Sequence, residues 1–180
     1  MTADSTSFRT AVPATRDRNL STDIGLLILR VVFGLLFAAH GTQKLFGWFD
    51  GPGLAANNAG FDQMGFNPGG FFGTLAGLSE LVGGLLLALG ALSPLGAAIV
   101  LGTTIVIIDT TFSGGLLTGQ GYETGLLFAT VAATLAFTGP GRFSVDHNGP
   151  WARGGVVWGA IAVAAAVVAA VLTLILESAL

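Results

Sequence analysis

Cysteine is absent from this chain of 180 residues, and charged side chains are scarce. Without a thiol, the protein forms no disulfide, no thiolate metal site and no cysteine nucleophile. Only 9% of the residues are charged, against roughly a quarter in ordinary soluble domains, while 52% are hydrophobic. The 7 Lys and Arg against 10 Asp and Glu also provide no basic surface for nucleic acid. The composition therefore predicts a protein whose solvent is the lipid bilayer, with no nucleic-acid partner.

Five apolar segments are candidates for membrane-spanning helices, each of which needs about 20 mostly apolar residues. The expected spans are residues 24–48, 71–92, 95–112, 122–138 and 154–176, and the fourth is the shortest. Gly, Pro and Asn residues between the first two spans mark a loop, within which residues 54–66 have the length for a short surface helix. The pattern predicts an all-α integral membrane bundle.

The polar N-terminal segment sets the expected orientation. Residues 1–23 carry Arg9, Arg16 and Arg18 among Ser and Thr, and we expect a disordered cytoplasmic tail. Arg142 and Arg153 follow the fourth span, on the side of the membrane where the tail lies. Because Lys and Arg concentrate in short cytoplasmic segments, the N-terminus is predicted in the cytoplasm and the C-terminus outside, in a multi-pass protein of the bacterial inner (plasma) membrane.

Ionisable side chains at membrane depth are the candidate functional residues. Each costs about 2.5–3.5 kcal/mol even on the lenient insertion scale, so each needs a partner, a wet cavity or a function. The residues that meet this test are Arg30, His40, Glu80, Asp109 and Glu123. A structural role stays open for all of them, because buried charges also pair to fix helix register.

Charge and small residues share one face on each of the first two spans. Arg30, His40 and Lys44 fall within one stripe of the first span. Glu80 shares its face with glycines at small-xxx-small spacing, which lets helices approach closely. We therefore expect Glu80 to pair with either His40 or Lys44. The alternative for Lys44 and for Arg30 is to snorkel toward the membrane surface, which is the reading we favour for Arg30.

Further polar residues gather in the outer half of the membrane. Asp109 lies near the outer end of the third span, and Tyr122 and Glu123 lie at the start of the fourth. No metal site is expected, because the two histidines and the carboxylates lack His-x₃-His or Glu-x-x-His spacing. The glycines form no phosphate-binding motif and indicate close helix packing.

Four segments together resemble the DoxX family of small bacterial membrane proteins. They are LLILRVVFGLLFAAHGTQKLFG (residues 26–47), GLSELVGGLLLALG (77–90), GYETGLLF (121–128) and FTGPGRFSVD (137–146). The resemblance implies a DoxX-like membrane domain of four helices over residues 24–145. Residues 146–180 would then add a loop and a fifth transmembrane helix at the C-terminus.

The resemblance also implies a redox setting. Family members resemble the small membrane subunit of thiosulfate:quinone oxidoreductase, and mycobacterial relatives are linked to a membrane oxidoreductase complex that handles oxidative and thiol stress. By that analogy a site for quinone or a small sulfur species would be lined by His40, Gln43, Lys44, Glu80 and Glu123.

Three functions stay open at this stage. In a membrane subunit of an oxidoreductase, His40 or Glu80 would transfer protons as a catalytic residue. The ligand-binding residues would be Gln43, Lys44, Asp109, Tyr122 and Glu123. A non-catalytic scaffold for a soluble redox partner protein explains the missing cysteines with fewer assumptions. A small-molecule permease is weakened by the absence of a visible inverted repeat.

Overall fold

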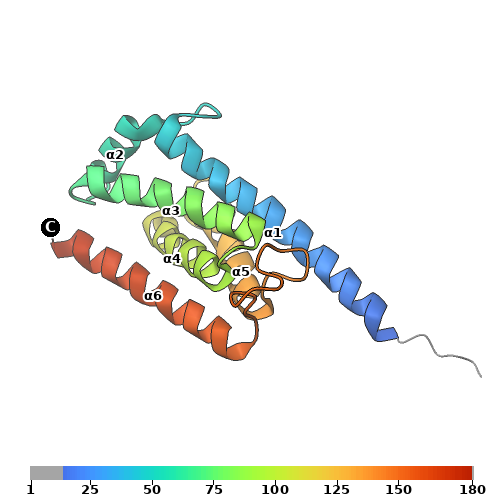
Figure 1. Cartoon of the computed structure of the whole chain (residues 1–180). Helices are drawn as coiled ribbons and strands as arrows, with labels where there is room; N and C mark the ends of the chain where they lie inside the picture. Colours follow the sequence, from blue (N-terminus) through green and yellow to red (C-terminus); the bar gives the residue numbers. More distant parts are fainter. Residues whose placement is uncertain (1–13, 180) are drawn as a thin grey trace, which may run out of the picture.

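The structure is a bundle of helices (Figure 1). The computed structural model describes the backbone of residues 14–179 and the side chains of residues 20–179. Its helices are α1 (Ala14–Phe46), α2 (Gly53–Gln63), α3 (Gly69–Leu89), α4 (Ser93–Thr111), α5 (Glu123–Thr138) and α6 (Val156–Ala179), with a short 3₁₀ turn, η1 (Phe112–Gly114), after α4. The predicted all-α membrane architecture is confirmed.

Four helices of the described region are long and apolar enough to cross a membrane. These spans are Leu20–Phe46, Gly69–Leu89, Ser93–Gly114 and Val156–Ala179, which match the first, second, third and last predicted spans. Helix α5 is apolar but has only 16 residues. At 1.5 Å per residue it is about 24 Å long, somewhat short of the roughly 30 Å hydrocarbon layer.

The N-terminal segment differs from the expectation. Helix α1 begins at Ala14, so residues 14–23 are helical and not a disordered tail. The remainder of the predicted tail, residues 1–13, lies outside the described residues. The short helix expected over residues 54–66 is present as α2.

Helices α1 and α3 pack antiparallel with their backbones in contact. A Cβ atom added at Gly34 would lie 2.5 Å from the amide nitrogen of Ala88, and one added at Gly84 would lie 2.5 Å from that of Ala38. Farther along, a Cβ at Gly41 would lie 2.7 Å from the Gly77 carbonyl oxygen. Any side chain larger than hydrogen would separate the helices, so these glycines set the distance between α1 and α3.

The other helices assemble around α4. Helix α4 packs against α3, α5 and α6, whereas the backbones of α3 and α6 do not come close to each other in the part of the chain that the structure describes. A Cβ at Gly102 of α4 would lie 3.2 Å from the Ala166 carbonyl of α6, so a small residue brings these two helices together. Buried apolar side chains from α1, α4 and α5, among them Phe37, Val100 and Ala132, fill the centre of the bundle.

Arg30 is buried, with 2% of its surface exposed, so the prediction that it snorkels is wrong. Its guanidinium group donates to the carbonyl oxygens of Ala88, at the end of α3, and Phe143, in the segment after α5. The prediction failed because it counted depth from residue 24. The helix begins ten residues earlier, and the segment after α5 folds over this end of the bundle.

Asp146 caps helix α4 from a distance in the sequence. Its carboxylate accepts hydrogen bonds from the amides of Leu92 and Ser93, at 3.1 and 2.8 Å, and from the Ser93 hydroxyl at 2.7 Å. These amides stand at the start of α4, where helical N–H groups have no partner within the helix. The segment that ends in Asp146 thus contacts Arg30 of α1 and the start of α4, and Arg30 also binds the end of α3, so these hydrogen bonds connect the three helices.

Candidate functional site

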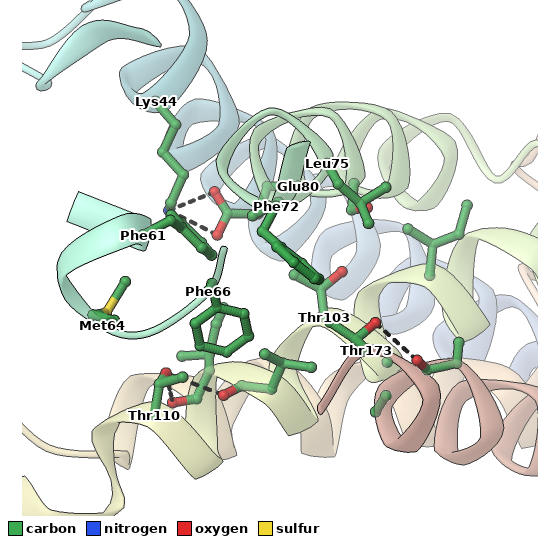
Figure 2. Close-up of a pocket in the computed structure, with 18 of the residues that line it drawn as sticks. Lys44, Phe61, Met64, Phe66, Phe72, Leu75, Glu80, Thr103, Thr110 and Thr173 are labelled. Carbon is green, nitrogen blue, oxygen red and sulfur yellow. Dashed lines mark hydrogen bonds and ion pairs between the residues drawn. The ribbon is translucent and has the colours of Figure 1, made fainter. Parts of the chain in front are cut away.

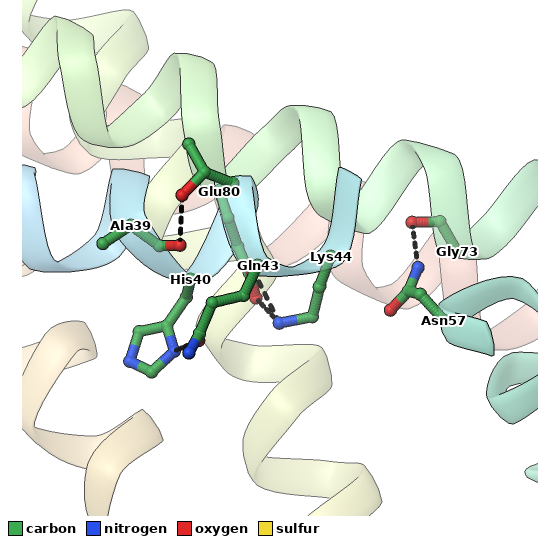
Figure 3. A network of polar contacts seen from close by, with 8 residues as sticks. Ala39, His40, Gln43, Lys44, Asn57, Gly73 and Glu80 are labelled. Carbon is green, nitrogen blue, oxygen red and sulfur yellow. Dashed lines mark hydrogen bonds and ion pairs between the residues drawn. The ribbon is translucent and has the colours of Figure 1, made fainter. Parts of the chain in front are cut away.

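An ion pair joins α1 to α3 inside the bundle (Figure 3). The ammonium group of Lys44 donates to both carboxylate oxygens of Glu80, at 2.8 and 2.7 Å. Glu80 is 1% exposed, whereas 26% of the Lys44 side chain is exposed. Of the two partners considered from the sequence, the structure pairs Glu80 with Lys44.

Small residues let the pair form. Gly77 lies one helical turn before Glu80, and a Cβ atom there would lie 2.8 Å from the Leu45 side chain and 3.4 Å from the Cβ of Lys44. The close approach of α1 at this point brings Lys44 within reach of a carboxylate that α3 holds inside the bundle. A bidentate charge-assisted contact of this kind is among the stronger polar interactions in proteins.

The ion pair stands in the wall of a cavity of about 240 Å³ (Figure 2). The lining comes from α3, α4, α6 and the segment that begins with α2, in addition to Lys44 of α1. Most of the lining is apolar. The lining residues beside Lys44 and Glu80 are Phe61, Met64, Phe66, Phe72, Leu75, Ala76, Ser79, Ala98, Ile99, Gly102, Thr103, Val106, Ile107, Thr110, Ala169, Ala170 and Thr173.

The polar side chains that line this cavity are those of Lys44 and Glu80 and four hydroxyl residues, Ser79, Thr103, Thr110 and Thr173. The hydroxyl groups of Thr110 and Thr173 donate to carbonyls of their own helices, those of Val106 and Ala169. The Lys44 ammonium has three N–H donors, and the Glu80 oxygens are its acceptors in the described structure. One of these three N–H groups therefore has no acceptor among the described residues.

His40 and Gln43 lie outside this cavity. His40 is exposed; its Nδ1 atom is 3.2 Å from Oε1 of Gln43, and its ring meets the Phe128 ring edge-on at 6.0 Å. Gln43 in turn donates to the carbonyl oxygen of Phe49 at 3.2 Å. Arg30, His40 and Lys44 lie on one helix face, as expected, yet each meets a different neighbour.

Asp109 lies in a second cavity, of about 230 Å³, between α4 and the end of α6. This second cavity adjoins the first, because both are lined by Met64, Phe66 and Thr110, and it also contains Glu177 and Leu174.

The remaining predicted site residues lie apart. Tyr122 stacks on Phe112, with ring centroids 5.1 Å apart and planes at 19°. Glu123 begins α5. Neither of these residues lines the two cavities just described. The structure therefore brings Lys44 and Glu80 together and places Asp109 in the adjoining cavity. The other predicted site residues lie away from both cavities.

Two contributions to the cavity were missed from the sequence. Asn57 of α2 donates to the carbonyl oxygen of Gly73 at 2.9 Å, which ties α2 to α3 at the end of the cavity. Helix α6 supplies Ala169, Ala170 and Thr173 to the wall. The sequence did contain a sign that α6 faces a cavity, because Thr173 is the one hydroxyl residue in the apolar run 159–176.

The sequence model of the DoxX family matches residues 25–114, half of the chain. The protein belongs to the DoxX family. The matched segment holds Lys44, Glu80 and Asp109, and it runs from within α1 through η1. Helices α5 and α6 follow the matched DoxX segment. No curated protein and no solved structure shows a significant match to the chain.

Proposed function

We propose that this DoxX-family protein is a membrane subunit of an oxidoreductase system, and that its Lys44–Glu80 cavity binds the head group of a quinone-type molecule. The observation that carries this proposal is a mostly apolar cavity between candidate membrane-spanning helices with the Lys44–Glu80 ion pair in its wall. An intramembrane ion pair at a cavity is by default a hypothesis for a functional site, because charged side chains are rare and costly at membrane depth.

The residues present fit such a ligand. A quinone ring is flat and apolar, and its carbonyl oxygens accept hydrogen bonds. The free ammonium proton of Lys44 supplies the donor, and Phe72 and Ile99 supply apolar surface. The volume of about 240 Å³ lies below the roughly 300–1,000 Å³ of sites that enclose a whole drug-sized molecule, so it suits a head group.

In this proposal the chain supplies binding and protons, whereas a redox partner protein supplies electrons. Quinone reduction takes up protons together with electrons, and Glu80 and Lys44 hold a proton next to the cavity. His40 lies one helical turn before Lys44 on α1 and is exposed. We propose that His40 exchanges this proton with the surroundings and that Gln43 orients its ring.

One substitution at each residue of the Lys44–Glu80 pair tests the proposal. Purified protein should carry quinone detectable by mass spectrometry, and Glu80→Gln should keep the fold but lose quinone-linked turnover in the assembled system. Lys44→Met should lose the bound quinone, because it removes the donor. Wild-type protein that neither retains quinone nor binds added quinone would refute the proposal.

A non-catalytic scaffold is the second candidate, and one observation favours it. Both oxygens of Glu80 are bound by Lys44, as they would be in a pair that only fixes α1 against α3. In that case Glu80→Gln should behave as wild type in every functional assay, while Glu80→Ala loses stability. Co-purification of a soluble redox protein without quinone would then identify the anchored partner.

A further inference from the structure

The size of the Lys44–Glu80 cavity raises the question of where the rest of a bound molecule lies. The following inference rests on the proposed function. A volume of about 240 Å³ accommodates a head group but not a long apolar tail, which must leave the cavity. Four of the lining residues are exposed, and we take them to mark two openings: Leu75 and Ala169 at the side of the bundle, and Met64 and Thr110 at its end.

The side opening lies between α3 and α6. Leu75 of α3 is 41% exposed and lines the cavity. Ala169 of α6 is also exposed and lines it from the other side. The backbones of the described α3 and α6 do not approach each other, although α4 packs against both, so only side chains can close the gap between them. Leu75 lies about 9 Å from the start of α3, and Ala169 lies about 15 Å from the end of α6. Both residues are therefore well away from the ends of these candidate membrane spans.

The end opening is polar. It passes Met64 and Thr110, which are exposed, into the second cavity with Asp109 and Glu177. An apolar tail that left by this route would displace water from two carboxylates without replacing their hydrogen bonds, which is unfavourable. The same tail at the side opening would stay among lipid chains.

We infer that the tail of the bound molecule leaves the cavity between α3 and α6, over Leu75 and Ala169, and that α6 therefore selects which tails the site accepts. Helix α6 is outside the segment that matches the DoxX family. Tail selection is thus a property that the C-terminal part of this chain adds to a head-group site built from the matched segment.

The test uses two probes that differ only in the tail. Decylubiquinone and 2,3-dimethoxy-5-methyl-1,4-benzoquinone, which has the same ring substituents and no tail, are titrated against purified protein in detergent, and dissociation constants are taken from ligand-induced thermal stabilisation. The variant is Ala169→Leu, which places a bulky side chain in the side opening. The matched control is Ala164→Leu, the same change at an exposed position of α6 that lines neither cavity. Thr110→Leu narrows the end opening instead.

Ala169→Leu should weaken binding of decylubiquinone by about tenfold or more and leave the tail-less probe within about threefold. Both control substitutions should leave the ratio of the two affinities unchanged. Equal weakening of both probes by Ala169→Leu, no weakening of either, or loss of tail preference in Thr110→Leu would overturn the route. If wild-type protein binds neither probe, the proposed function itself fails. If wild type binds both and Ala169→Leu binds them equally well, only the inference fails.

Discussion

Replacement of Gly34 by alanine tests the backbone contact that positions the site. The added Cβ atom would lie 2.5 Å from the Ala88 amide nitrogen and 2.6 Å from the Gly84 carbonyl oxygen, whereas ordinary contacts begin at 3.4 Å. Both neighbours are backbone atoms, so no side chain can turn away to make room. The helices would have to separate by about 0.9 Å. A gap of that size removes a quarter to a half of the dispersion energy of each contact that it widens.

The expected cost follows from this separation. Overpacking costs typically 1–3 kcal/mol, and we expect Gly34→Ala to lie at about 3 kcal/mol because the obstacle is backbone. Gly25→Ala on the same helix is the matched control, since nothing lies within 4 Å of its added Cβ atom. There the substitution should be neutral or should stabilise by up to roughly 1 kcal/mol through helix propensity.

Thermal unfolding in detergent measures both variants, with retained quinone as a second readout. Gly34→Ala should unfold several degrees below wild type, and Gly25→Ala at or above it. Because Lys44 reaches Glu80 across the same α1–α3 contact, the first variant should also retain less quinone. Equal stability of the two variants would show that α1 and α3 are not packed backbone to backbone, and would remove the geometric basis of the site.

Three further predictions concern the polar contacts that hold the bundle. Arg30→Met should destabilise the protein by about 2–4 kcal/mol, because two buried carbonyl oxygens lose a charged donor; chemical denaturation in detergent measures this. Asp146→Ala should lower the free energy of unfolding by about 1–3 kcal/mol, because it leaves the first amides of α4 without an acceptor. Asp146→Asn should restore part of that stability. Equal stability of Asp146→Ala and wild type would contradict the capping role. Asn57→Leu should loosen α2 from α3 and raise the rate of proteolysis within residues 53–66, whereas the exposed Asn67→Leu should not.

The membrane spans were predictable because hydropathy reports which solvent a segment prefers. Hydropathy does not report whether a helix continues beyond the membrane. Residues 14–23 were therefore predicted to be a disordered tail, although they are helical. The error about Arg30 followed from that boundary. The Lys44–Glu80 pair was predictable as one of two options, since helical spacing gives the face but not which side chain reaches the partner.

The cavity was beyond the reach of the sequence for a physical reason. Helix α6 consists almost wholly of Ala, Val, Leu and Ile, so its periodicity does not distinguish the face on α4 from the face in lipid. Ala169 lines the cavity only because α6 lies close to α4, and the contact between Gly102 and Ala166 sets that distance. That distance is decided by packing between segments far apart in the chain.

The number of membrane crossings is the last prediction, and the directions of the helices decide it. Asp109 near the end of α4 and Glu177 near the end of α6 line one cavity, so these two helices end on the same side of the bundle. The start of α6 lies at the end of α5, where the Gly155 amide donates to the Phe137 carbonyl oxygen at 2.6 Å. Helix α5 must therefore return across the bundle between them, although it is short.

Five crossings would place the start of α1 and the end of α6 on opposite sides of the membrane, and in Figure 1 these two helix ends lie at opposite ends of the bundle. The Arg142 amide donates to the Asp23 carboxylate at 3.0 Å, so the basic segment with Arg142 and Arg153 lies at the end of the bundle where α1 starts. That end is predicted to be cytoplasmic, because Lys and Arg concentrate on the cytoplasmic side. Green fluorescent protein should then fluoresce only as an N-terminal fusion, and alkaline phosphatase should be active only at the C-terminus. Fluorescence of green fluorescent protein at both termini would mean that α5 enters the membrane without crossing it.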